Sequence, residues 1–150
     1  MLKVTIIAIG KLKEHFWKDA CSEYLKRLGA YAKVTVRELP DSTPAQEEKL
    51  ILSTLDTLPR GAHVILLDIG GNLVSSEDLA RRLDGLAVGG TSDVVFIIGG
   101  SDGVTAAIRA RADERISFGR ITLPHNLARV VLLEQVYRAC KISRGEPYHK

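Results

Sequence analysis

Short apolar strands alternate with helices along the whole chain, and this alternation restricts the folds that the chain can adopt. The sequence predicts strands at Lys3–Ile9, Lys33–Leu39, His63–Ile69, Asp93–Ile98 and Ile116–Phe118. It predicts helices at His15–Leu28, Thr43–Leu58, Ser76–Val88, Thr105–Ala112 and Leu127–Ile142. Regular alternation of this kind is typical of an α/β fold with a mostly parallel sheet and helices on both faces.

Residues that favour helix ends and turns support these boundaries. Thr43 opens a capping-box pattern in which a proline takes the first helical position. Ser75 or Ser76 is predicted to cap the third helix, and Asn126 to cap the first turn of the last one. Residues 70–72, Gly-Gly-Asn, predict a turn after the third strand.

The last predicted helix, Leu127–Ile142, is apolar on nearly every side. Its apolar residues cannot all face one sheet; they include Leu127, Val130, Val131, Leu133, Val136, Tyr137 and Cys140. A helix with this pattern is buried on two sides. In a chain of 150 residues we expect the second side to be covered by a partner subunit, which predicts a homodimer through this helix.

Length and composition predict one globular domain over residues 1–150, with 45% hydrophobic and 26% charged residues. No apolar run approaches the ~20 residues that a membrane span needs, and the apolar start of the chain reads as a strand rather than a signal peptide. Cys21 and Cys140 are typical of reduced core cysteines in a cytoplasmic protein. The four histidines lack metal-ligand spacing, so no metal site is expected.

The net charge of +3 is unevenly distributed. Residues 1–33 carry seven Lys and Arg against three Asp and Glu, and residues 129–150 carry five against two. The middle of the chain, residues 34–128, carries nine against thirteen. The basic ends either form an ordinary solvated surface or build a basic face that binds a polyanion.

Ligands of parallel sheets bind beyond the carboxyl ends of the strands, so the candidate binding segments are residues 67–71, 99–103 and 118–123. Two common nucleotide-binding motifs are missing from them, because the chain contains no G-x-G-x-x-G and no G-K-[ST]. Asp68 and Asp102 lie at strand ends, where they either converge on a site or, as we expect, cap loops.

Five short motifs together resemble a known family. They are Leu-Leu-Asp-Ile-x-Gly at 66–71, Ile-Gly-Gly-Ser-x-Gly at 98–103, Leu-Pro-His at 123–125, Gln-Val-Tyr-Arg-Ala at 135–139 and Pro-Tyr-His at 147–149. Because the five motifs occur together and in this order, the chain resembles the small SPOUT-class methyltransferases of bacterial ribosomal RNA. Within that class it resembles the ribosomal RNA large subunit methyltransferase H family. The resemblance extends from Lys3 to the end of the chain.

This resemblance implies a fold and a cofactor. The fold is an α/β domain with a C-terminal trefoil knot, and the cofactor is S-adenosylmethionine (S-adenosyl-L-methionine), held by the knot loops. Carried over to this sequence, the cofactor-binding residues are Leu67, Gly99, Phe118, Gly119, Arg120, Ile121, Thr122 and Leu123. Paired glycines at 99–100 let the backbone approach a ligand closely, which agrees with this role.

The resemblance also implies a reaction, methylation of N3 of a pseudouridine in the inter-subunit stem-loop of 23S ribosomal RNA, carried out by a homodimer on the assembled ribosome. N3 must lose its proton before it can attack a methyl group, so a base and a cation are needed. His149, Tyr148 and Arg138 are the catalytic candidates, with His149 as the base. The RNA-binding candidates are Arg129, Lys141 and Arg144.

Two other functions stay open. The chain is either a related methyltransferase that acts on another RNA, such as a tRNA, or a ribosome-binding module without catalysis. The C-terminal Tyr148 and His149 also have a second interpretation, because terminal residues are often frayed.

Overall fold

All 150 residues are described in the computed structural model, and five parallel strands form a single sheet. The strands are β1 (Leu2–Ile9), β2 (Ala32–Leu39), β3 (His63–Leu73), β4 (Asp93–Ile98) and β5 (Glu114–Ser117), in the spatial order β2-β1-β4-β3-β5. Every neighbouring pair is parallel. The predicted parallel sheet is therefore confirmed.

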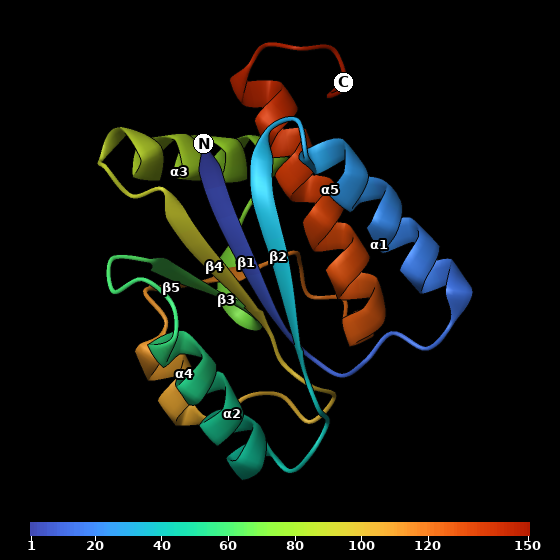
Figure 1. Ribbon diagram of the computed structural model, residues 1–150, viewed down its shortest axis with the longest axis vertical. Helices are drawn as coiled ribbons and strands as arrows, with labels where there is room; N and C mark the ends of the chain where they lie inside the picture. The colour runs from blue at the N-terminus through green and yellow to red at the C-terminus, as the bar shows by residue number, and fades with distance from the viewer.

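Helices cover both faces of this sheet, as predicted (Figure 1). The helices are α1 (His15–Leu28), α2 (Pro44–Asp56), α3 (Ser76–Val88), α4 (Ala106–Arg111) and α5 (His125–Ser143). Helices α1, α3 and α5 pack on one face, and α2 and α4 pack on the other. The trefoil knot that the resemblance implies remains a prediction.

The core follows the two-residue period of the strands. In β1, Ile6 faces the layer of α1 and α5, whereas Ile7 faces α2 and α4. In β4, Phe96 and Ile97 divide between the same two layers, and all four of these side chains are fully buried. Successive side chains of a strand point to opposite faces, so a continuous apolar run marks a strand covered on both.

Two predicted helix caps are confirmed and one is wrong. The Gln46 N–H donates to Thr43 Oγ1 over 3.3 Å, and Ser75 forms a reciprocal capping box with Asp78. Asn126 does not cap α5, because the helix begins one residue earlier, at His125. Its Oδ1 is buried and has no hydrogen-bond partner.

The third strand extends beyond its predicted end at Ile69, so the predicted turn at 70–72 is wrong. Ile116 of β5 pairs with both Leu67 and Asn72, with an irregularity between them, so β3 continues along its neighbour. A Cβ atom on Gly71 would lie 2.7 Å from the carbonyl carbon of Arg115, so only glycine fits there. The pairing with β5 replaces the turn that the local sequence favours.

Helix α5 lies between two helices of its own chain, α1 and α3. Every residue from His125 to Ile142 is buried or half-buried. Much of the all-round apolar surface of α5 is therefore covered within one chain, and the homodimer remains a prediction.

Candidate cofactor site and carboxyl-terminal tail

A cavity of about 620 Å³ lies beyond the carboxyl ends of β3, β4 and β5. Its walls come from three segments, at 67–69, 98–104 and 116–125, with Arg109 and Ala128 at its border. This is the position in which open parallel sheets bind their ligands. The three loops predicted from the sequence therefore meet at one cavity.

Seven of the eight predicted cofactor-binding residues line this cavity. They are Leu67, Gly99, Phe118, Gly119, Ile121, Thr122 and Leu123. Arg120 is exposed and does not line it. The structure thus brings together residues more than fifty positions apart in the sequence.

The loop after β5 is fixed by a serine that the sequence analysis missed. The buried Ser117 Oγ accepts a hydrogen bond from Gly119 N–H at 3.1 Å and donates one to Gly119 O at 2.9 Å. Gly119 has a φ of 133°, which strongly favours glycine. The pattern Ser-x-Gly at a strand end is the local signal for such a turn.

The loop after β4 presents backbone to the cavity. Gly103 has a φ of 80°, and its N–H donates to Gly100 O over 3.0 Å. A Cβ on Gly99 would lie 2.6 Å from Val104 Cγ1, and one on Gly100 would lie 3.0 Å from Glu47 Oε1. Both glycines are therefore needed for packing behind the loop, which leaves its backbone facing the cavity.

Asp68 supplies a charge to the cavity wall. Its Oδ2 lies 3.3 Å from Arg109 Nε and 3.1 Å from Arg115 Nη1, and its Oδ1 accepts from Gly70 N–H. Burial acts to raise the pKa of this carboxyl, but these hydrogen bonds and the two arginine charges lower it overall. Asp68 thus caps its loop as predicted, whereas Asp102 does not line the cavity.

These walls fit S-adenosylmethionine. The apolar side chains Leu67, Phe118 and Leu123 suit an adenine ring, and nearby backbone amides and carbonyls can bond its edge. The carboxylate of Asp68 suits hydroxyl or ammonium groups. The cavity is also large enough for a ligand of this size.

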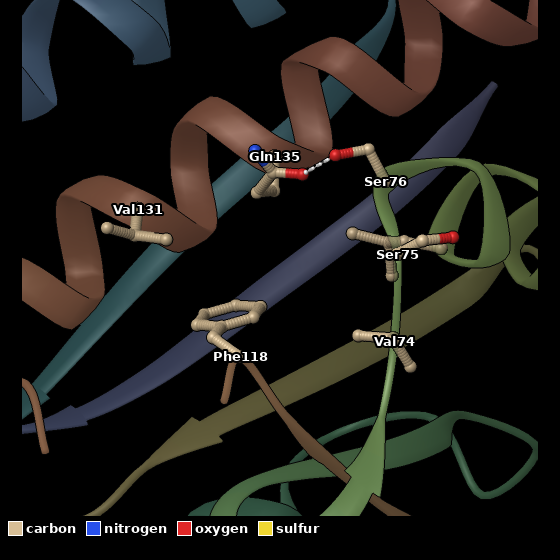
Figure 2. Close-up of a pocket in the computed structure, with 7 residues that line it drawn as sticks. Val74, Ser75, Ser76, Phe118, Val131 and Gln135 are labelled. Atoms are coloured by element: carbon tan, nitrogen blue, oxygen red, sulfur yellow. Dashed lines mark hydrogen bonds between the residues drawn. The ribbon is translucent and has the colours of Figure 1, made fainter. Parts of the chain in front are cut away.

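A smaller cavity of about 280 Å³ adjoins the first, with Phe118 in the wall of both. Figure 2 shows the Phe118 ring between Val131 of α5 and Val74, just after β3. The hydroxyl of Ser76 donates to Gln135 Oε1 over 2.6 Å on the far side.

The three predicted catalytic residues lie together at the end of α5. Arg138 Nη1 is 3.1 Å from His149 Nδ1, and its guanidinium carbon lies 4.7 Å from the centre of the Tyr148 ring. Tyr148 packs edge-on against Tyr137, and its hydroxyl donates to Glu134 Oε2 over 2.8 Å. The tail is therefore docked on α5 and not frayed.

The environment of Tyr148 keeps it a neutral donor. Burial and the hydrogen bond to the Glu134 carboxylate raise the pKa of its phenol to about 12. Glu134 also forms an ion pair with Arg138 at 3.0 Å.

The tail and the cavity lie at opposite ends of helix α5. His125 lines the cavity at the start of α5, and Arg138 comes thirteen residues later. At 1.5 Å per residue this places Arg138 about 20 Å along the helix. Figure 1 shows the C-terminus at the end of α5 that is remote from the carboxyl ends of the strands.

One predicted RNA contact is wrong. Arg129 is only 3% exposed, because its guanidinium bonds Glu38 Oε2 at 2.5 Å and Gly10 O at 3.0 Å. An arginine buried in this way anchors α5 to β1 and β2 and does not reach a phosphate.

The other two predicted RNA contacts lie at the surface or close to it. Arg144 is exposed, with its guanidinium carbon 4.8 Å from the centre of the Tyr31 ring. Lys141 pairs with Glu146 at 3.0 Å. Hydrogen bonds to Tyr31 and Glu146 raise the pKa of Lys141.

No group of His, Cys, Asp and Glu side chains is arranged to hold a metal ion, and none of the helices is long and apolar enough to span a membrane.

Comparison with known proteins agrees with the fold and identifies the family. The family described as "Predicted SPOUT methyltransferase" matches residues 2–149. Proteins named "Ribosomal RNA large subunit methyltransferase H" from Listeria monocytogenes serotype 4a (strain HCC23) and Bacillus thuringiensis (strain Al Hakam) are each 50% identical. Each alignment covers 99% of this chain and 100% of the relative.

A solved structure shares the fold. The A. aeolicus TrmH/SpoU tRNA modifying enzyme superposes with a TM-score of 0.51 at 16% identity, over 95% of this chain and 77% of that one. The chain thus belongs to the SPOUT methyltransferase family, whose members use S-adenosylmethionine. Within that family it groups with the ribosomal RNA large subunit methyltransferase H proteins.

Proposed function

We propose that this protein methylates N3 of a pseudouridine in the inter-subunit stem-loop of 23S ribosomal RNA, with S-adenosylmethionine as donor and the assembled ribosome as substrate. The cavity that unites residues 67, 99, 118, 119 and 121–123 is the observation that carries this proposal. The full-length relatives, which are named for a large-subunit RNA activity, support the choice of RNA.

The cavity residues would bind the methyl donor, and other residues would activate the acceptor nitrogen of the RNA. When bound, S-adenosylmethionine supplies an electrophilic methyl group on sulfonium sulfur. Leu67, Phe118 and Leu123 would hold the adenine, and the loop backbone at 99–103 would contact the remainder of the ligand. Enclosure of this kind also excludes water from the reacting atoms.

The tail supplies the groups that an imide needs. An imide edge presents an N–H beside a carbonyl oxygen, and His149 Nδ1 lies beside the guanidinium of Arg138. In the proposed mechanism Nδ1 takes the N3 proton, and Arg138 donates to the carbonyl oxygen on which negative charge develops. Tyr148, held as a neutral phenol, packs against the base.

The distance between the cavity and the tail supports a site shared by two subunits. Arg138 lies about 15–20 Å along α5 from Ala128 and His125, the residues of this helix that line the cavity. The tail of one protomer therefore acts at the cavity of its partner. The protein is then a homodimer, with α5 at the interface. Obligate interfaces typically bury ~2,000 Å² or more, so sedimentation of a stable folded monomer at low micromolar concentration would argue against this assembly.

In this proposal the RNA phosphates are contacted by Lys141 and Arg144. Because the substrate is the ribosome, we also propose that the protein is cytoplasmic. Arg144 is exposed beside the tail, where it can reach a phosphate next to the target nucleotide. Arg129 has no such role, because it is buried.

The test is methylation of ribosomes from a strain that lacks the protein, with methyl-labelled donor and mass spectrometry of 23S RNA and tRNA. The expected product is label on one pseudouridine of the inter-subunit stem-loop. Label on tRNA instead would favour a different SPOUT activity. Calorimetry provides a second measurement, because a non-catalytic ribosome-binding module would bind no S-adenosylmethionine.

A further inference from the structure

The imidazole of His149 is held between charged side chains from two helices. Its Nε2 lies 2.5 Å from Oε1 of Glu77, in the first turn of α3. Its Nδ1 lies 3.1 Å from Nη1 of Arg138, on α5. Glu77 is 72 residues away in the sequence, so the fold alone brings it to the tail.

These two contacts fix the protonation of the ring. A guanidinium carries only donors, so Nδ1 must accept from Arg138. The ring proton is therefore on Nε2, which donates to the Glu77 carboxylate. The basic lone pair lies at Nδ1, beside the cation that an ionised imide requires.

Glu77 is the only carboxylate that bonds the ring. The charged and titratable groups around His149 are Glu77 of α3, Arg138 and Glu134 of α5, and the neighbouring Tyr148. Glu134 is already engaged by Arg138 and Tyr148. The hydrogen bond with His149 lowers the pKa of Glu77, so this carboxyl is ionised near neutral pH.

We propose that Glu77 is the positioning residue of the methyl-transfer reaction. It orients the His149 ring by accepting a hydrogen bond from Nε2, and it stabilises the imidazolium formed when Nδ1 takes the N3 proton. A carboxylate that orients a catalytic histidine acts in this way in hydrolases with a Ser-His-Asp triad. The proposal rests on the proposed function, in which His149 is the base.

Glu77 also has a purely structural interpretation. A carboxylate in the first turn of a helix stabilises it through the helix dipole, typically by 0.3–1 kcal/mol. That role would affect the stability of α3 but not the titration of His149. The test therefore needs a measurement that helix stability does not change.

The decisive variant is Glu77→Gln, which keeps a hydrogen-bond acceptor and removes the charge. Glu23→Gln is the matched control, because Glu23 is a surface carboxylate that pairs with Arg27 at 2.7 Å on another helix. Both variants are assayed for kcat and KM on ribosomes from pH 5 to 9. The affinity for S-adenosylmethionine is measured alongside.

Glu77→Gln is expected to lower kcat about 10- to 100-fold, with KM and cofactor affinity unchanged. Loss of the negative charge disfavours the imidazolium, so the acidic limb of the kcat profile moves to lower pH. Glu23→Gln leaves both unchanged. An acidic limb in the same place for Glu77→Gln and wild type would overturn the proposal.

A spectroscopic measurement separates this inference from the proposed function. Nitrogen-15 shifts of the His149 ring, assigned by their loss in His149→Ala, should report a proton on Nε2 in the wild type. Arg138 still holds this tautomer in Glu77→Ala, so the signal to follow is the Nε2–H group that Glu77 accepts from. Its nitrogen-15 and proton shifts should move to those of a ring without a carboxylate acceptor, and unchanged shifts would contradict the role of Glu77. If His149→Ala methylates ribosomes at the normal rate, the base assignment fails first, and the role of Glu77 fails with it.

Discussion

Replacement of Arg129 by alanine tests whether this residue anchors the fold or binds RNA. The side chain is only 4% exposed, and it connects α5 to β2 through Glu38 and to the end of β1 through Gly10 O. Removing it leaves the carbonyl of Gly10 without its partner, which costs about 1–3 kcal/mol. Its three methylenes contribute about 2 kcal/mol of burial.

Two features keep the expected loss of stability small. The Glu38 side chain is 36% exposed, so water replaces much of the ion pair, and losing that pair costs about 1 kcal/mol or less. The buried Nε of Arg129 has no partner, and its removal recovers about 1 kcal/mol. We expect Arg129→Ala to lower the free energy of unfolding by about 3 kcal/mol, and the melting temperature by roughly 6–12 °C.

Urea titration at constant protein concentration and pH 7 measures this loss, with Arg144→Ala, at the residue that follows α5, as the control. The exposed Arg144 should change stability by less than about 0.5 kcal/mol. The Arg144→Ala variant should reduce by about 1 the slope of a plot of log RNA affinity against log salt concentration. If Arg129→Ala unfolds like the wild type and reduces that salt slope, Arg129 binds RNA and the buried interpretation is wrong.

The stability loss of Arg129→Ala should depend on pH, because Arg129 pairs with the titratable carboxyl of Glu38. Burial acts to raise the pKa of Glu38, but the hydrogen bond and charge of Arg129, with the N–H of Leu12, lower it overall. A carboxyl with a lowered folded-state pKa stabilises the protein above its unfolded value of about 4.3. That contribution is lost as the pH falls through the folded value. The stability difference between wild type and Arg129→Ala should therefore shrink below about pH 4.3 and be full at pH 7.

Three further results follow from the site. Gly99→Val should weaken S-adenosylmethionine binding at least about 10-fold by calorimetry, because the new Cβ would push Val104 and displace the loop. Gly61→Val is the control, because a Cβ on Gly61 would have no neighbour within 4 Å. Deletion of Tyr148–Lys150 should cut methyl transfer about 10²–10⁴-fold and leave cofactor affinity unchanged; a normal rate would remove the tail from the mechanism. Assembled ribosomes should be methylated far faster than a naked stem-loop, since few cations are available for phosphate contacts; equal rates would refute ribosome recognition.

Elements defined by local periodicity could be predicted from the sequence. Helix α1 has its predicted bounds, His15–Leu28, because its apolar residues recur on one face and Gly29 follows. Strand β4 also has its predicted bounds, as a continuous apolar run covered on both faces. The cavity followed from the rule that ligands lie at the carboxyl ends of strands.

Features that depend on distant residues could not be predicted. The extension of β3 requires the pairing of Asn72 with Ile116, forty-four residues later, against the local preference of Gly-Gly-Asn for a turn. Arg129 looked like an RNA contact because a basic residue near a basic terminus is usually exposed. Its burial follows from the position of Glu38 on a strand ninety-one residues earlier.

The tail shows most clearly how a site is built from residues that no motif connects. Tyr148 bonds Glu134, Glu134 accepts from Gln135 Nε2, and Gln135 Oε1 accepts from Ser76, in three hydrogen bonds of 2.6–2.8 Å. Ser76 and Gln135 line the cavity that Phe118 separates from the cofactor loops, and Glu77 follows Ser76 directly. The first turn of α3 therefore contacts both the tail and the wall next to the cofactor loop. A substitution in this turn should shift the pH profile of methyl transfer more than it changes cofactor affinity. The turn is hydrogen-bonded to His149, whereas it reaches Phe118 only through packing around the smaller cavity.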